Sequence, residues 1–203
     1  MFDPNLMTAV FIGRSGCGKG TQANLLIDYL KANYGADAPI LYVETGARFR
    51  DFITKDSFSS RRAKELMNDN ELQPSFLSTF MWANELIDKI KEDQHLVIDG
   101  SPRKLTEAQT LASALRFYGR FRPTIIHLNV SRDWSLDRLS GRGRSDDDLA
   151  GIEKRLDWFE AEVAPAIEFF KNDGHFSYLD INGEQSIEEV HQSIVLALTG
   201  ANN

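Results

Sequence analysis

The stretch of sequence that decides the fold reads Gly13-Arg14-Ser15-Gly16-Cys17-Gly18-Lys19-Gly20-Thr21. A short apolar run with aromatic and β-branched residues precedes it at 7–12, and leucine and tyrosine recur at helical spacing after it, at 22–32. A glycine-rich turn between a strand and a helix points backbone N–H groups inward around a phosphate, and the helix N-terminus adds partial positive charge. The stretch therefore predicts a phosphate-binding loop, with Lys19 beside the β- and γ-phosphates and the Thr21 hydroxyl towards Mg²⁺.

Strand and helix patterns alternate along the rest of the chain. Further strands are predicted at 40–43, 95–98, 123–130 and 176–181. Helices are predicted as two short pieces within 47–70, broken near 56–59, and at 74–91, 106–118, 131–140, 148–171 and 186–198. This order indicates a single α/β domain over 1–203, with a five-stranded parallel sheet and helices on both faces. The segments 45–73 and 140–148 fit the alternation poorly, so we expect them to be mobile or to face the substrate.

The composition excludes several classes of protein. The chain has 203 residues, of which 42% are hydrophobic and 26% charged, and this rules out disordered, collagen-like and disulfide-scaffold proteins. The balance of 23 basic against 30 acidic side chains, a net −7, argues against binding to nucleic acid or an anionic membrane. The single cysteine, Cys17, allows no intrachain disulfide and no cysteine zinc site. With no apolar run near 18 residues and no basic leader, we expect a cytoplasmic protein.

Several motifs together resemble one known family, the adenylate kinase branch of the nucleoside monophosphate kinases. Gly-Lys-Gly-Thr-Gln at 18–22 matches its phosphate loop, with Gly20 where other phosphate loops carry Ser or Thr. The residues at 45–50, Thr-Gly-Ala-Arg-Phe-Arg, are similar to its Thr-Gly-Asp-x-x-Arg motif, and Asp-Gly-Ser-Pro-Arg at 99–103 is similar to its Asp-Gly-Phe-Pro-Arg. Lid and C-terminal motifs are matched by Arg138, Arg142, Arg144, Asp146, Asp147, Arg155, Leu156, Val163, Pro165, Ile167 and the run 186–190.

The resemblance implies the reaction ATP + AMP ⇌ 2 ADP with Mg²⁺, in a monomer with a monophosphate-binding insertion at 45–74 and a minimal lid at 140–148. The ATP-binding residues would be Gly13, Ser15, Gly16, Cys17, Gly18, Lys19, Gly20, Thr21, Arg138 and Arg142. The acceptor monophosphate would be bound by Thr45, Gly46, Arg50, Gly100, Arg103, Glu107, Arg144 and Arg155. The catalytic residues would be the cations Lys19, Arg103, Arg142, Arg144 and Arg155. Mg²⁺ would be bound by Thr21 and, through water, by Asp99.

Four departures from the family pattern bear on this interpretation. Ala47 replaces an aspartate near the metal's water shell, and Ser15 replaces a proline of the loop. The lid is very short, since only Gly143 separates Arg142 from Arg144. Glu107 stands where adenylate kinases usually carry a glutamine that reads adenine. An ionised carboxylate accepts from an amine of adenine or cytosine, which favours an amine-bearing base. The resemblance to the family puts AMP first and CMP second. The alternative is that Glu107 points to solvent and backbone groups read the base.

Other functions remain open at this level. A uridylate or cytidylate kinase fits the same motifs; such enzymes carry an asparagine at the position of Glu107, so this position matches neither kind of enzyme. A catalytically silent nucleotide-binding module would be expected to lack Lys19 or the lid arginines, and all of them are present. Asp146 and Asp147 either position the lid arginines or form a charge pair at a helix N-terminus. Arginines outside the motifs are expected on the solvated surface: Arg14, Arg61, Arg62, Arg116, Arg120 and Arg122. The histidines are expected at strand edges or on the surface: His95, His127, His175 and His191. Cys17 is expected to be neutral packing.

Overall fold

The structure, a computed structural model, describes residues 6–141 and 149–200. Its five strands form one parallel sheet in the order β2-β3-β1-β4-β5, which confirms the predicted fold class. The strands are β1 (Thr8–Gly13), β2 (Ile40–Glu44), β3 (His95–Asp99), β4 (Thr124–Asn129) and β5 (Ser177–Asn182). Because all strands run the same way, their carboxyl ends meet at one edge of the sheet.

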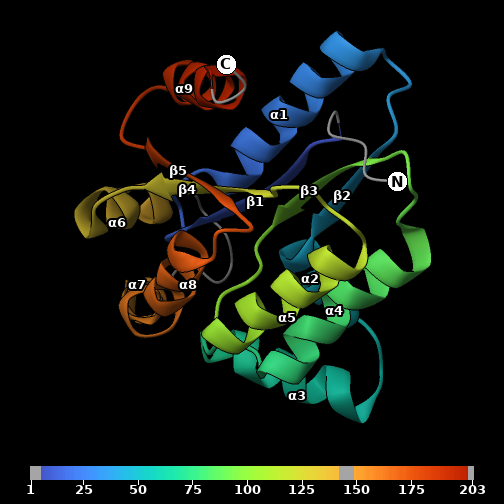
Figure 1. The fold of residues 1–203 in the computed structure, drawn as a ribbon. Helices are drawn as coiled ribbons and strands as arrows, with labels where there is room; N and C mark the ends of the chain where they lie inside the picture. The colour runs from blue at the N-terminus through green and yellow to red at the C-terminus, as the bar shows by residue number, and fades with distance from the viewer. Residues whose placement is uncertain (1–5, 142–148, 201–203) are drawn as a thin grey trace.

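Helices cover both faces of the sheet (Figure 1). α1 (Lys19–Tyr34) and α9 (Ile187–Gly200) lie on one face, and α4 (Ser75–Lys89), α5 (Leu105–Phe117) and α8 (Ala164–Asn172) lie on the other. Alternate residues of β1 therefore enter two separate apolar cores: Val10 packs in the core that holds Leu111 of α5, and Phe11 in the core that holds Leu26 of α1. In the described part of the chain, no helix is long and apolar enough to cross a membrane.

The segment that follows β2 is helical and has a small core of its own. α2 (Thr45–Phe52) begins directly after the strand, and α3 (Phe58–Asn68) begins with a capping box in which the Ser57 hydroxyl accepts from the Ser60 N–H. Phe49, Ala63 and two residues of α4 form a separate apolar cluster beside these helices. The predicted break between two short helices is confirmed, at residues 53–57.

The predicted helix over 148–171 is interrupted. It consists of α7 (Leu149–Trp158), a π-helical turn η1 (Phe159–Val163) and α8. The π turn inserts one residue into the hydrogen-bond ladder. The periodicity of apolar residues does not predict such a local change. α6 (Arg132–Ser140) ends close to the predicted lid. The lid residues Arg142, Arg144, Asp146 and Asp147 lie outside the described residues.

The far end of the helical segment is docked onto α7. The Lys154 ammonium donates to the Asp69 carbonyl at 2.9 Å and pairs with Glu71 at 2.6 Å. Asn70, which has a left-handed φ of 52°, lies against Gly151 so closely that a β-carbon at 151 would come within 2.2 Å of its Nδ2. Asparagine tolerates that backbone conformation better than most residues. A glycine in α7 therefore permits this contact.

We predict that Gly151→Ala destabilises the protein by about 1–3 kcal/mol, because the Asn70 side chain must be displaced from a packed position. In an Asn70→Ala background the same substitution should be neutral or stabilising by up to about 1 kcal/mol, since alanine favours the helix more than glycine does. Urea denaturation of the four proteins of this double-mutant cycle measures both values. An equal cost in both backgrounds would contradict the proposed contact.

Candidate active site

The glycine-rich loop joins β1 to α1 as the sequence predicts. Gly16 and Gly18 adopt φ values of 83° and 94°, which side chains with a β-carbon rarely tolerate. The Lys19 ammonium folds back over the loop and donates to the carbonyls of Gly13 at 3.0 Å and Arg14 at 2.8 Å. The loop thus holds a flexible cation at its centre, where a phosphate can replace the two carbonyls as its partner.

The glycine at position 20 is explained by the limited space around it. A β-carbon at position 20 would lie 3.3 Å from Oδ2 of Asp99, which ends β3. The register of the sheet pairs Asp99 with Phe11 of β1, two residues before the loop begins, and so brings the carboxylate to the base of the loop. A serine or threonine at position 20 would crowd it. The departure from the common phosphate-loop pattern therefore makes room for Asp99.

Asp99 is suited to hold a hydrated cation. Its side chain is buried, and burial raises its pKa, while the charge of Lys19 works in the opposite direction. Oδ1 has no hydrogen-bond partner among the residues that the structure describes. Thr21 is exposed and lines the same cavity as Asp99. Carboxylate and hydroxyl oxygens are ligands that Mg²⁺ and its water shell accept, so these two residues fit the metal predicted from the sequence.

Two cavities adjoin these residues, and the larger of them, of about 720 Å³, lies in front of the loop. It brings together the predicted ATP-binding residues Ser15, Gly16, Cys17, Gly18, Lys19, Gly20, Thr21 and Arg138. Gly13 does not reach its wall; a β-carbon there would meet the Leu128 carbonyl at 2.6 Å, so this glycine serves close packing of β1 on β4. Burial raises the pKa of the Cys17 thiol, which supports its interpretation as neutral packing.

Trp134 is a residue of this cavity that the sequence did not single out. Its ring lies beneath the Arg138 guanidinium, at 4.6 Å from the ring centroid, one helical turn away on α6. Both side chains line the cavity. An aromatic ring in this position restrains the guanidinium plane through a cation–π contact. The i, i+4 spacing of the two residues was the available signal.

A smaller cavity, of about 160 Å³, lies between α2, the linker before α4, and α5. Apart from Arg144, which is not among the described residues, it unites all the predicted acceptor-site residues: Thr45, Gly46, Arg50, Gly100, Arg103, Glu107 and Arg155. The sequence did not single out Gln73, Ser78 and Trp158, which also line it. Gathering three arginines around one small space suits an anionic ligand.

These cations have carboxylate neighbours. The Arg50 guanidinium pairs with Glu44 at 2.7 Å. Burial lowers the pKa of Arg103, and the charges of Glu107 and Asp99 oppose that effect. The positive charges of Arg155 and Arg50 lower the Arg103 pKa further, so each of them repels the Arg103 guanidinium. A bound phosphate would relieve that repulsion.

Glu107 is buried in the wall of the smaller cavity, so the alternative that it points to solvent is wrong. Its Oε2 accepts from the Arg103 backbone N–H at 2.9 Å, which fixes the carboxylate at the start of α5. Burial raises the pKa of this carboxyl group, although the hydrogen bonds from the Arg103 backbone and Ser78 counteract the shift.

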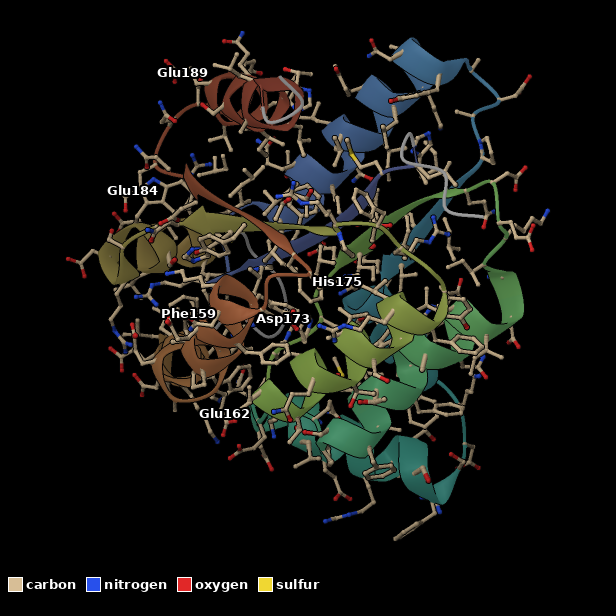
Figure 2. The ribbon with its side chains drawn as sticks, viewed as in Figure 1. Phe159, Glu162, Asp173, His175, Glu184 and Glu189 are labelled. Carbon is tan, nitrogen blue, oxygen red and sulfur yellow. The ribbon has the colours of Figure 1, made fainter. Side chains whose placement is uncertain are left out.

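Two arginines expected on the surface are instead packed. Arg120 is buried and donates to the Gln94 carbonyl at 2.6 Å. Arg14 donates to the Val130 carbonyl at 3.1 Å and lies 3.9 Å above the ring of Phe159, which Figure 2 labels on the π-helical turn. The surface prediction was wrong because long side chains cover apolar groups with their stems and planes. His95 and His127 are buried as well. In the described ranges no three metal-binding side chains cluster.

The family model described as adenylate kinase matches residues 11–175 of the chain. The chain belongs to the adenylate kinase family. It is 30% identical over 192 residues to the adenylate kinase of Corynebacterium urealyticum, an alignment that covers 95% of this chain and 99% of the relative. It is 31% identical over 192 residues to that of a Mycobacterium species, with the same coverage. Adenylate kinase 1 of a Nostoc species shares 30% over 189 residues. As a member of this family, the chain is a phosphotransferase.

We predict that Glu107→Gln changes how stability depends on pH. The raised pKa means that the folded state binds the Glu107 proton more tightly than the unfolded chain does. Glu107 therefore makes the free energy of unfolding fall as the pH rises from the ordinary carboxyl range through its raised pKa. The glutamine variant lacks this term, so its stability relative to the wild type should increase between about pH 4 and pH 8. Urea denaturation across that range measures the difference, and a pH-independent difference would contradict the burial argument.

Proposed function

We propose that ATP occupies the larger cavity and AMP the smaller one, and that the chain catalyses ATP + AMP ⇌ 2 ADP. The observation that supports this is the wall common to both cavities. Ser15, Gly46, Arg50, Gly100 and Arg103 line the larger and the smaller cavity alike. A phosphate of each nucleotide can therefore meet at the same two guanidinium groups, as a direct transfer between them requires.

The protein itself forms no covalent bond to the nucleotides in this reaction. An oxygen of the AMP phosphate attacks the γ-phosphorus of ATP, the bond from that phosphorus to the β–γ bridging oxygen breaks, and ADP forms on both sides. In the proposed arrangement Lys19 exchanges its loop carbonyls for the β- and γ-phosphates, and Arg50 and Arg103 hold the AMP phosphate. Arg155, together with Arg142 and Arg144, would neutralise the transferring group. Fixed cations in a site from which water is excluded stabilise the charge that develops.

Asp99 and Thr21 are the residues proposed to hold Mg²⁺ with ATP, Asp99 through water. When bound, the metal would neutralise phosphate charge. This chain's own contribution is the buried, acceptor-only carboxylate beside Lys19. Ala47 supplies no carboxylate, so Asp99 would carry this role without help from that position.

The insertion at 45–74 and the lid at 140–148 are proposed as the parts that enclose the nucleotides. The insertion supplies Arg50 and part of the smaller cavity, and Lys154 ties its far end to α7. We also propose that the protein acts as a monomer in the cytoplasm.

A bisubstrate mimic tests the proposed pairing of the two cavities. Two adenosines joined by five phosphates should bind far more tightly than ATP or AMP, since one molecule fills both cavities and relieves the repulsion among the arginines. It should raise the melting temperature more than saturating ATP and AMP together do. Solution scattering should show compaction on binding, and a mimic no better than ATP would contradict the shared wall.

An acceptor panel tests the function itself. With ATP as donor, AMP should be the best acceptor among AMP, CMP, UMP, GMP and dTMP, with CMP second. Lys19→Met should lower kcat by about 10³-fold or more, because its cation stabilises the transition state more than the ground state. Lys31→Met, on the exposed side of the same helix, is the matched control and should retain full activity. UMP as best acceptor, or a fully active folded Lys19→Met protein, would overturn the proposal.

A further inference from the structure

Arg14 is a residue of the phosphate loop whose side chain joins the loop to two distant segments. Its Nε donates to the carbonyl of Val130, which follows β4, at 3.1 Å. Its Nη2 pairs with Glu160 at 2.5 Å, and its guanidinium lies 3.9 Å from the ring centroid of Phe159. Both partners belong to the π-helical turn η1, where Figure 2 labels Phe159. The Arg14 side chain is only 15% exposed, so water competes little for these contacts.

The shape of the guanidinium suits these three partners. Arginine carries five N–H donors in a planar fork, and its flat face stacks on aromatic rings. One arginine can therefore hold a carbonyl, a carboxylate and a ring at the same time. Because the partners lie at the end of β4 and on the π-helical turn, Arg14 restrains the phosphate loop relative to both elements.

The ring that Arg14 covers lies on the same side of its helix as Arg155. Arg155 is in α7, four residues before Phe159, and side chains four residues apart in a helix lie one above the other. The regular hydrogen-bond ladder of α7 gives way to the π turn at Phe159. A contact from outside the helix at this residue therefore helps to fix the direction of the face that carries Arg155.

A third and much smaller cavity, of about 30 Å³, lies between the phosphate loop and this helix face. Its lining includes Arg14 and Phe159 together with the cations Lys19, Arg103 and Arg155. The volume is about that of one water molecule, so the groups around it lie close together. Lys19 and Arg155 thus border one narrow space, and the contact between Arg14 and Phe159 is part of the same wall.

We infer that Arg14 is a positioning residue, which sets Arg155 relative to Lys19 for phosphoryl transfer. In this role it contacts neither nucleotide and acts on Arg155 through Phe159 and α7. The inference rests on the proposed function and adds to it the means by which two cations, distant in sequence, keep a fixed separation. A misplacement of about 1 Å at such a site can slow a reaction by about 100-fold. Arg14 should therefore affect the transfer step rather than the binding of either nucleotide.

Arg14→Met is the variant that tests this role. Methionine covers the Phe159 ring with a side chain of similar length and lacks the guanidinium. The single-turnover rate of transfer from ATP to AMP should fall by about 10- to 100-fold, because Arg155 is no longer held in place. The Kd values of ATP and AMP, measured by calorimetry, should change by less than about 3-fold. Arg14→Lys keeps the charge without the planar fork and should recover only part of the rate.

The melting temperature checks that each variant folds. Phe159→Leu removes the ring from the other side of the contact and serves where Arg14→Met does not fold. Arg116→Met is the matched control, because it removes an arginine that pairs with a carboxylate, Asp173, in the last turn of α5. The control should transfer phosphate at the wild-type rate.

An Arg155→Met background separates positioning from general support of the fold. If Arg14 acts through Arg155, adding Arg14→Met to this background should lower the transfer rate by less than about 2-fold. An equal loss in both backgrounds, or a wild-type rate in Arg14→Met alone, would overturn the inference and leave the proposed function standing. A wild type that transfers no phosphoryl group from ATP to AMP would refute the proposed function, and the inference with it.

Discussion

Positive charge concentrated at the carboxyl edge of the sheet is the constraint on which the rest of this structure depends. Lys19, Arg50 and Arg103 converge there, in a protein whose net charge is −7. Like charges brought together in a partly buried space repel one another; burial lowers the pKa of Arg103, and the charges of Arg155 and Arg50 lower it further. Carboxylates offset this positive charge: Glu44 and Asp99 lie opposite each other at the ends of the neighbouring strands β2 and β3. A nucleotide phosphate can take over the same role.

Two close approaches let the surrounding elements maintain this arrangement. Gly20 allows the first turn of α1 to lie against Asp99, and Gly151 allows α7 to lie against Asn70 at the end of the helical insertion. Arg14 adds a third connection, from the loop to the π-helical turn through Phe159 and Val130. Each contact joins a segment that carries a cation to a neighbour that is distant in sequence. The cations are consequently positioned by packing as well as by charge.

The two cavities differ in the chemistry of their walls. The larger one pairs a guanidinium with an aromatic ring, Arg138 over Trp134, which suits the face of a base. The smaller one is lined by the buried carboxyl group of Glu107, which suits the edge of a base. Because stacking on a face distinguishes bases weakly and hydrogen bonding at an edge distinguishes them strongly, selection for the base is expected on the acceptor side.

The sequence by itself determined the fold class, the five strands and the phosphate loop. These features follow from periodicity and from a motif of fixed spacing, which are local properties of the chain. Seven residues of the smaller cavity were named from the resemblance to the family, whereas Gln73, Ser78 and Trp158 were not. Tertiary structure alone decided the burial of Glu107 and Arg120, the packing of Arg14 over Phe159 and the reason for Gly20. Each of these depends on which side chain faces another across elements distant in sequence. Only the packing of α1, α3, α5 and the π-helical turn establishes such pairings, because spacing along one element carries no information about its neighbours.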